Sequence, residues 1–134
     1  MPNSVNQDNP ATILIVDDNK TTRRILKSLL INLGYDHLIE ATQGKEALQL
    51  MREHEIALII SDWNMPKLTG YELLKIVKSD DRLHTIPFIM VTSLDQPEDI
   101  LLSIEAKVDD YIVKPFTRVV LEKKINKVLK KFCQ

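Results

Sequence analysis

The sequence predicts an α/β protein built on a doubly wound, five-stranded parallel sheet. Five short apolar runs of strand length alternate with segments of helical period, a pattern typical of βαβ units. The first and third runs contain continuous apolar stretches, as expected for strands that helices cover on both faces. Together these observations favour an open sheet with five helices divided between its two sides.

The predicted strands and helices alternate along the chain. The predicted strands are residues 12–16, 37–41, 56–60, 86–91 and 111–113. A segment with one apolar stripe follows each of them, as surface helices of such a protein do. After a first helix through residues 25–33, the predicted helices are residues 44–53, 70–79, 97–107 and 117–132. The pattern therefore predicts three layers, with the sheet in the middle.

Particular residues support these helix boundaries. Gly34 is placed to stop the first helix. The expected apolar stripe of that helix is Ile25, Leu26, Leu29, Leu30 and Leu33. Pro97 suits the first position of a helix, where its missing N–H needs no partner. The expected apolar face of the last helix is Leu121, Ile125, Val128, Leu129 and Phe132.

Length and composition favour one cytoplasmic domain. The 134 residues suit a single core, so we expect a flexible tail over residues 1–11 and one domain over residues 12–134. The net charge of −1 gives no general bias toward nucleic acid or membranes. The single cysteine, Cys133, cannot form an intramolecular disulfide, which suits a reducing compartment. We expect neither a leader peptide nor a membrane span, because no apolar run approaches about 20 residues.

Polar residues stand at the ends of four predicted strands. Asp17 and Asp18 follow the first strand, Asp62 follows the third, Thr92 ends the fourth and Lys114 follows the fifth. Parallel strands bring their carboxyl ends to one rim, where open α/β sheets bind ligands. One polar residue after a strand is usually a turn former or a helix cap. Five on one rim predict a functional site.

Three carboxylates on one rim would repel each other. Two unit charges about 4 Å apart interact by about 4 kcal/mol at an effective dielectric near 20. Mg²⁺ would offset this repulsion, because it takes oxygen ligands and binds phosphate, whereas the alternating acids of a calcium loop are absent. Lys114 adds a cation and Thr92 a hydroxyl donor. The set therefore supplies an oxygen nucleophile, a metal site and donors for a phosphoryl group.

The chain resembles the receiver domains of two-component response regulators. The resemblance rests on IVDD at 15–18, SDWNMP at 61–66, VT at 91–92 and YIVKPF at 111–116. Their order and intervals match over residues 12–132. Among receivers the chain is most similar to the chemotaxis CheY type, through residues 63–66 and 90–92 and the lack of an output domain. The resemblance implies the flavodoxin-like strand order 2-1-3-4-5.

The resemblance also implies a metal site and a phosphoacceptor. Asp62 would accept the phosphoryl group, and Asp18 would bind Mg²⁺ directly. Asp17 would position a metal-bound water, and the backbone carbonyl of Asn64 would be a further ligand. The protein would then be its own substrate, with self-catalysed phosphorylation and hydrolysis, and not a conventional enzyme.

Further expectations concern the phosphoryl group and the partners. Thr92 and Lys114 would contact the phosphoryl oxygens, and Tyr111 would be the aromatic switch residue. The phosphodonor would be a sensor histidine kinase. The target would be a protein, such as the flagellar motor switch, bound through the fourth helix, the fifth strand and the fifth helix.

Other functions stay open at this point. A stand-alone receiver can also pass phosphate to a histidine phosphotransfer domain in a phosphorelay. A phosphatase of the haloacid dehalogenase class also uses an aspartate nucleophile and magnesium, but it needs Asp-x-Asp, whereas residues 17–19 have adjacent acids. Flavodoxins and P-loop proteins need phosphate loops that this sequence lacks, with only 3 glycines.

Several residues depart from the receiver pattern or have no expected role in chemistry. Ala106-Lys107 stands where receivers commonly end the fourth helix with Ala-Gly, so a left-handed residue there would lack glycine. The lysines of the last helix are expected to form a solvated face, with an acidic protein surface as the second interpretation. Trp63 and Met65 are expected to pack the loop before Pro66. The histidines, which lack metal-ligand spacing, are His37, His54 and His84.

Overall fold

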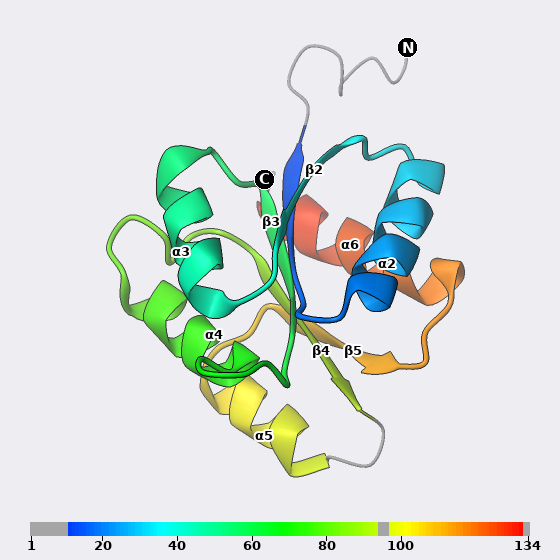
Figure 1. The fold of residues 1–134 in the computed structure, drawn as a ribbon. Coiled ribbons are helices and arrows are strands. Elements are labelled where there is room, and N and C mark those ends of the chain that lie inside the picture. Colours follow the sequence, from blue (N-terminus) through cyan, green and yellow to red (C-terminus); the bar gives the residue numbers. More distant parts are fainter. Residues whose placement is uncertain (1–10, 94–96, 133–134) are drawn as a thin grey trace.

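The computed structural model of the chain describes residues 11–93 and 97–132. The predicted tail lies outside the described residues except for residue 11, and so does Cys133. Within the described ranges, each predicted strand and helix is present in the predicted order (Figure 1). No helix in these ranges is long and apolar enough to cross a lipid bilayer. The cytoplasmic location stays a prediction.

Five parallel strands form one sheet in the order β2-β1-β3-β4-β5, which confirms the predicted order. The strands are β1 (Thr12–Val16), β2 (His37–Ala41), β3 (Leu58–Asp62), β4 (Phe88–Ser93) and β5 (Asp110–Lys114). The helices are α2 (Lys20–Asn32), α3 (Gly44–Glu53), α4 (Gly70–Ser79), α5 (Pro97–Glu105) and α6 (Arg118–Phe132). All strands run in one direction, so their carboxyl ends share one rim.

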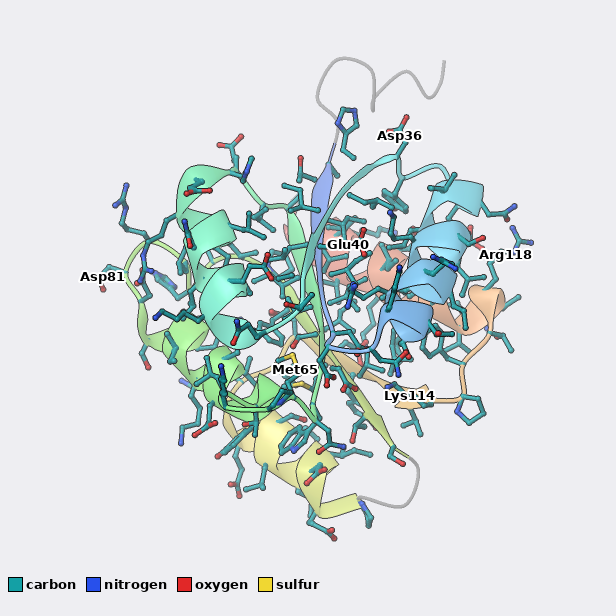
Figure 2. All side chains as sticks on the ribbon, in the orientation of Figure 1. Asp36, Glu40, Met65, Asp81, Lys114 and Arg118 are labelled. Atoms are coloured by element: carbon teal, nitrogen blue, oxygen red, sulfur yellow. The ribbon has the colours of Figure 1, made fainter. Side chains whose placement is uncertain are left out.

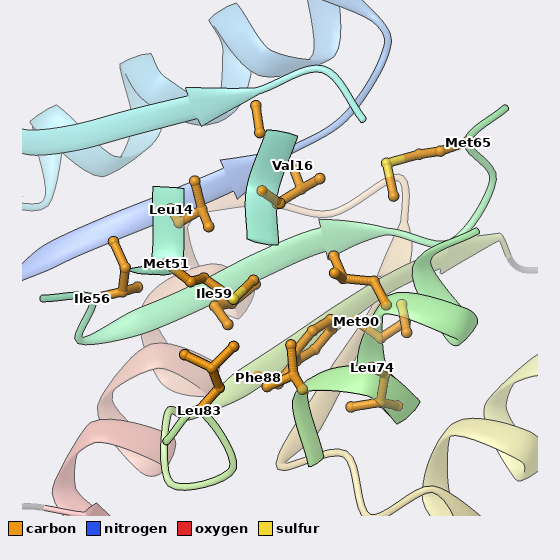
Figure 3. Packing of buried hydrophobic residues seen from close by; sticks show 14 of the residues in the cluster. Leu14, Val16, Met51, Ile56, Ile59, Met65, Leu74, Leu83, Phe88 and Met90 are labelled. Atoms are coloured by element: carbon orange, nitrogen blue, oxygen red, sulfur yellow. The ribbon is translucent and has the colours of Figure 1, made fainter. Parts of the chain in front are cut away.

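Helices cover both faces of the sheet, as predicted. Successive residues of a strand point to opposite faces, and β1 shows this with four fully buried residues. Ile13 and Ile15 pack with apolar residues of α2 and α6. Leu14 and Val16 pack with those of α3 and α4 (Figure 3), and α5 lies beside α4 (Figure 1). Because β1 is buried on both faces, its sequence is continuously apolar.

Three strands end later than predicted, which moves the site residues onto the strands. The predicted ranges 56–60, 86–91 and 111–113 are replaced by β3, β4 and β5 as given above. Ile56 is buried but precedes β3. Pro87 has no N–H for the ladder, so β4 begins after it, although its carbonyl accepts a 2.9 Å hydrogen bond from the Ile59 N–H. Consequently Asp62 and Lys114 are the last residues of their strands.

Two helices end with the same arrangement of hydrogen bonds. Gly34 after α2 and Lys107 after α5 have φ angles of 102° and 68°. Each donates its N–H to the carbonyl three residues earlier, and the next residue donates to the carbonyl five residues before itself, at 2.9 to 3.0 Å. These are Schellman motifs. The predicted stop at Gly34 is confirmed, whereas α5 ends at Glu105 because Lys107 is already left-handed.

The predicted apolar stripe of α2 is too wide. Leu26 and Leu30 are buried, and Leu29 and Leu33 pack partly buried against the same cluster. Ile25 has 54% of its surface exposed, so its assignment to the stripe was wrong. The face toward the sheet follows the 26, 29, 30 and 33 positions, and residue 25 lies outside that arc. An apolar side chain thus remains on the outer surface of α2.

Candidate functional site

Three aspartates converge at the carboxyl end of the sheet. Asp17 directly follows β1, Asp18 comes next, and Asp62 ends β3. One carboxylate oxygen from each lies within 4.8 Å of those of the other two. Asp17 and Asp62 are only 4% and 7% exposed, whereas Asp18 is exposed. The strand order explains the convergence, because β1 and β3 are neighbours in the sheet although α2, β2 and α3 lie between them in the sequence.

Burial makes ionisation of this cluster unfavourable. Desolvation raises the pKa of Asp62 above its usual range, and although Lys114 opposes this effect, Asp18 adds to it. Desolvation also raises the pKa of Asp17, against the hydrogen bond from the Asn19 N–H, and the charge of Asp62 raises it further. Buried like charges without enough counterions have this effect. The protein part of the site is therefore short of positive charge.

Lys114 supplies the cation at this site. Its Nζ lies 3.0 Å from Asp62 Oδ1, as an ion pair between the ends of β5 and β3. The side chain is 36% exposed, against 9% for that of Asp62. Lys114 lies at the rim, at the end of β5 (Figure 2). The ammonium therefore reaches a buried carboxylate while its own surroundings stay open to a ligand.

Thr92 lies near the end of β4, in register with β5. It is 3% exposed, and its Oγ1 is buried with no hydrogen-bond partner among the described residues. Its neighbour Ser93 pairs in register with Lys114, which brings both strand ends to the same place. A buried hydroxyl without a partner is unfavourable by about 1–3 kcal/mol. Such a group is ready to donate to an incoming oxygen.

The loop after β3 shapes the rim around Asp62. Trp63 and Met65 are 8% and 6% exposed and belong to the apolar core, which agrees with their expected packing role (Figure 2 labels Met65). The Trp63 ring stacks on Tyr71, with 5.1 Å between centroids. The Gly70 N–H donates to the Trp63 carbonyl at 2.8 Å, and a Cβ on Gly70 would overlap the Asp62 carbonyl. Only glycine permits this approach.

Tyr111 lies on β5 and is half-buried. In the sheet, β4 lies between β5 and β3, the strand that carries Asp62. The Lys124 Nζ lies 4.8 Å from its ring centroid, in a cation–π contact. The same ammonium forms a 2.9 Å ion pair with Asp110. Tyr111 therefore contacts the basic surface of α6 near the start of β5, three residues before Lys114 at the rim.

Sequence reasoning missed a second group of buried acids at the opposite end of β5. Asp110 accepts hydrogen bonds from Lys124 and from the Tyr111 N–H, and Lys127 lies 3.5 Å from its other oxygen. Both of these α6 lysines are thus paired, but only Lys124 is partly buried, at 29% exposed, so the expectation of a solvated basic face was wrong for Lys124. Lys127 is 73% exposed, as expected. Aspartate at the start of a strand, followed by lysines one helical turn apart on the next helix, was the available signal.

The acid cluster suits a divalent cation with oxygen ligands. Two buried carboxylates and one exposed carboxylate form a hard, negatively charged donor set, and Mg²⁺ typically takes one or two carboxylates and keeps several waters. The exposure of Asp18 leaves an open side for such waters. Asn64 is exposed in the loop two residues after Asp62, and its backbone carbonyl is the remaining ligand expected from the sequence. These residues fit the expected metal.

Comparison with known proteins agrees with the fold and the site. The sequence model of the response regulator receiver domain family matches residues 13–126. The chemotaxis protein CheY of Pseudomonas aeruginosa is 43% identical over 119 residues, covering 89% of this chain and 96% of that protein. A CheY homolog of Campylobacter jejuni is 42% identical over 118 residues, covering 87% of this chain and 91% of the homolog.

Solved structures give the same result. The signal receiver domain of a histidine kinase from Syntrophus aciditrophicus superimposes with a TM-score of 0.83 at 37% identity, covering 90% of this chain and 91% of that one. Chemotaxis protein CheY4 of Vibrio cholerae gives a TM-score of 0.81 at 33% identity, covering 89% and 98%. The predicted resemblance is confirmed: the chain belongs to the response regulator receiver domain family.

Proposed function

We propose that this chain is a phosphorylation-activated response regulator whose phosphoacceptor is Asp62. The observation that carries the proposal is the set of groups around that carboxylate. Lys114 lies 3.0 Å away, two further aspartates lie beside it, and the buried Thr92 hydroxyl has no partner among the described residues. The ammonium and the hydroxyl can both donate to phosphoryl oxygens, and the hydroxyl has no acceptor among the described residues.

The proposed reaction transfers a phosphoryl group from a phosphohistidine of a sensor kinase. An Asp62 carboxylate oxygen forms a bond to phosphorus as the bond from phosphorus to the histidine nitrogen breaks. Asp18, Asp62 and the Asn64 carbonyl would hold Mg²⁺, and Asp17 would position a metal-bound water. The metal would supply positive charge to the oxygens of the reacting group. Lys114 would exchange its carboxylate partner for a phosphoryl oxygen. Thr92 would donate its hydroxyl hydrogen to another.

The proposed output passes from the rim to the surface of α5, β5 and α6. Phosphorylation brings nearly one further negative charge and three acceptor oxygens, which would pull Thr92 and Lys114 inward. Tyr111 could then turn into the space that Thr92 leaves, and its contact with Lys124 would change. Moving a two-state equilibrium from 1:99 to 99:1 requires about 5.5 kcal/mol, which a few charge-assisted hydrogen bonds can supply.

The relatives support a chemotaxis role with a motor-switch type of target. Both curated relatives described above carry chemotaxis names at 42% and 43% identity. A phosphorelay role is the second candidate, because the Syntrophus receiver at 37% identity is part of a histidine kinase. In that case Asp62 would pass its phosphoryl group on to a histidine of another domain.

Phosphorylation of the full chain tests the acceptor and the metal. We expect a small phosphodonor to label the wild-type protein only when Mg²⁺ is present, and Asp62→Asn to abolish labelling in intact-mass spectrometry. Asp36→Asn, at an aspartate whose side chain is 76% exposed, is the control and should label normally. Labelling of Asp62→Asn, or labelling in excess chelator, would contradict the proposed acceptor or metal role.

Target binding tests the output surface. A captured target should bind more tightly to the beryllofluoride-treated protein than to the untreated one, and Tyr111→Ala and Lys123→Glu should weaken that binding. Lys123 is exposed on α6, and Lys45→Glu on α3 is the matched control on another face. Equal affinity in both states, or an effect of Lys45→Glu as large as that of Lys123→Glu, would contradict this surface. Transfer of phosphate to a histidine domain would favour the phosphorelay role.

A further inference from the structure

We infer that Arg23 is a positioning residue for the metal site, which fixes Asp17 through its backbone while anchored on Glu40. This inference rests on the proposed magnesium site and names a further residue that maintains it. Arg23 lies on α2, and its side chain is 13% exposed. It contacts the chain behind the acid cluster and not the carboxylates themselves.

The guanidinium of Arg23 makes two directed hydrogen bonds. Its Nη1 donates to the Asp17 backbone carbonyl at 2.7 Å, and its Nε donates to Glu40 Oε1 at 2.9 Å. Glu40 lies on β2, the neighbour of β1 in the sheet. One side chain therefore ties together α2, β2 and the first residue after β1.

Three polar groups of Asp17 are held by hydrogen bonds. Its N–H donates to the Ala41 carbonyl at 3.1 Å, its carbonyl accepts from Arg23, and its Oδ1 accepts from the Asn19 N–H at 2.8 Å. Two of these three restraints lead to β2, through Ala41 and, by way of Arg23, through Glu40. The direction of the Asp17 carboxylate is set by the orientation of its backbone, so loss of the Arg23 bond frees that orientation.

The planar geometry of the Arg23 guanidinium, and not its charge, explains its hydrogen bond to the Asp17 carbonyl. Glu40 accepts from both Arg23 and Lys27, at 2.9 Å each, so its charge neutralises much of theirs. The charges that shift the Asp17 pKa are those of Asp62, Lys114 and Asp18. A guanidinium can serve two acceptors in fixed directions, whereas an ammonium cannot reproduce that fork. Lysine at position 23 would keep the charge and lose one of the two bonds.

The chain offers two matched controls. Lys27 forms the same kind of ion pair with Glu40 but has no hydrogen bond or ion pair with Asp17 in the described part of the chain, so Lys27→Ala removes the ion pair alone. Arg24 is the exposed neighbour of Arg23, so Arg24→Lys repeats the substitution without either bond. A purely structural role of the Glu40 pairs would affect Lys27→Ala and Arg23→Lys alike.

Magnesium binding to the full chain decides the matter. Trp63, the only tryptophan, directly follows Asp62 and reports on the site by fluorescence. We expect Arg23→Lys to raise the Mg²⁺ dissociation constant about tenfold, the lower end of the range for residues that orient metal ligands. Lys27→Ala and Arg24→Lys should stay within about twofold of wild type. Lys27 is a partly exposed charge that salt screens, and Arg24→Lys keeps the charge at an exposed position.

Unfolding in chelator shows whether each variant is folded before its affinity is compared. If Arg23→Lys does not fold, Glu40→Gln replaces it, and that variant should raise the dissociation constant by weakening the anchor of the guanidinium. Wild-type affinity in the folded Arg23 or Glu40 variant, or an equal loss in Lys27→Ala, would overturn the inference alone. Absence of Mg²⁺ binding to the wild-type protein would instead overturn the proposed metal site.

Discussion

The sheet carries buried aspartates at both of its ends, and the two groups differ in how they are neutralised. Asp62 and Asp110 are each 7% exposed. Around Asp62, two further aspartates face a single lysine, and desolvation prevails and raises its pKa. Around Asp110, desolvation acts in the same direction, but Lys124, the Tyr111 N–H and Lys127 together outweigh it and lower its pKa.

Equal burial therefore has opposite consequences at the two ends. Asp109 and Asp110 are each paired with lysines of the protein: Asp109 accepts from Lys78 at 2.9 Å and from the Phe88 N–H at 2.7 Å. Asp110 Oδ1 accepts from Lys124, whereas its Oδ2 has an ion pair with Lys127 and no hydrogen bond among the described residues. The acid cluster at the rim has three carboxylates and, among the described residues, the one ion pair with Lys114. The difference separates a group that stabilises the fold from a group that is available for binding.

The largest expected change in the free energy of unfolding is at Asp109, directly before β5. Asp109→Ala leaves a mostly buried Lys78 ammonium and the Phe88 N–H without their acceptor, and should lower the free energy of unfolding by about 3 kcal/mol. Denaturant unfolding measures this, with Asp36→Ala as an exposed control expected to change it by less than about 0.5 kcal/mol. A loss as small as the control's would mean that these pairs do not stabilise the fold.

The rim should respond in the opposite direction. Asp17→Asn removes one charge from the cluster and keeps an acceptor for the Asn19 N–H, so it should stabilise the protein in chelator by about 2 kcal/mol. Two carboxylates about 4 Å apart repel each other by about 4 kcal/mol at an effective dielectric near 20, and Lys114 partly offsets this repulsion. With saturating Mg²⁺ this advantage should disappear, because the metal stabilises only the wild type strongly. Destabilisation in chelator would contradict the comparison.

The pH dependence of stability divides these effects further. The folded pKa values of Asp17 and Asp62 are raised above the ordinary value of 3.8. The folded protein therefore binds more protons than the unfolded chain between the two values, and the rim makes the protein less stable as pH rises through that interval. The contribution of Asp110, with its lowered folded pKa, is present above 3.8 and lost as pH falls through that folded pKa.

Unfolding of Asp17→Asn and Asp110→Asn in chelator across a pH series separates the two signs. The stability gain of Asp17→Asn should vanish as pH falls to about 3.8, and the loss in Asp110→Asn should vanish only below that. If both variants changed the free energy of unfolding in the same direction, or by an amount independent of pH, Asp17 and Asp110 would not have opposite effects on stability.

The smallest expected effect lies in the turn that leads into Asp109 and Asp110. Lys107 has the left-handed conformation that Gly34 adopts at the corresponding end of α2. Lys107→Gly should stabilise the fold by about 1 kcal/mol, because a non-glycine residue is unfavourable there by that amount. Mg²⁺ affinity should not change. A lowered unfolding midpoint would mean that the lysine side chain contributes more than the backbone strain removes.

Sequence reasoning reached the rim more reliably than the opposite end of the sheet. Asp17, Asp62, Thr92 and Lys114 were predictable because parallel strands place their carboxyl ends together whatever lies between them. The strand ends were displaced because an apolar residue such as Ile56 can be buried without joining the ladder. Pairing of Asp110 with Lys124 depends on where α6 crosses β5, and the exposure of Ile25 depends on the rotation of α2 about its axis. Periodicity alone determines neither.

The site is distributed over β1, β3, β4 and β5, and this has a consequence for biosynthesis. Lys114 comes from β5, which follows the other four described strands in the sequence, so a nascent or truncated chain that lacks β5 has Asp62 without its cation. Contacts between such distant segments form only after β5 has been synthesised, because the intervening loops must close first. Under the proposed function, competence to receive the phosphoryl group would then coincide with the addition of β5 to the sheet, and labelling of Asp62 would report on correctly folded protein in a mixture.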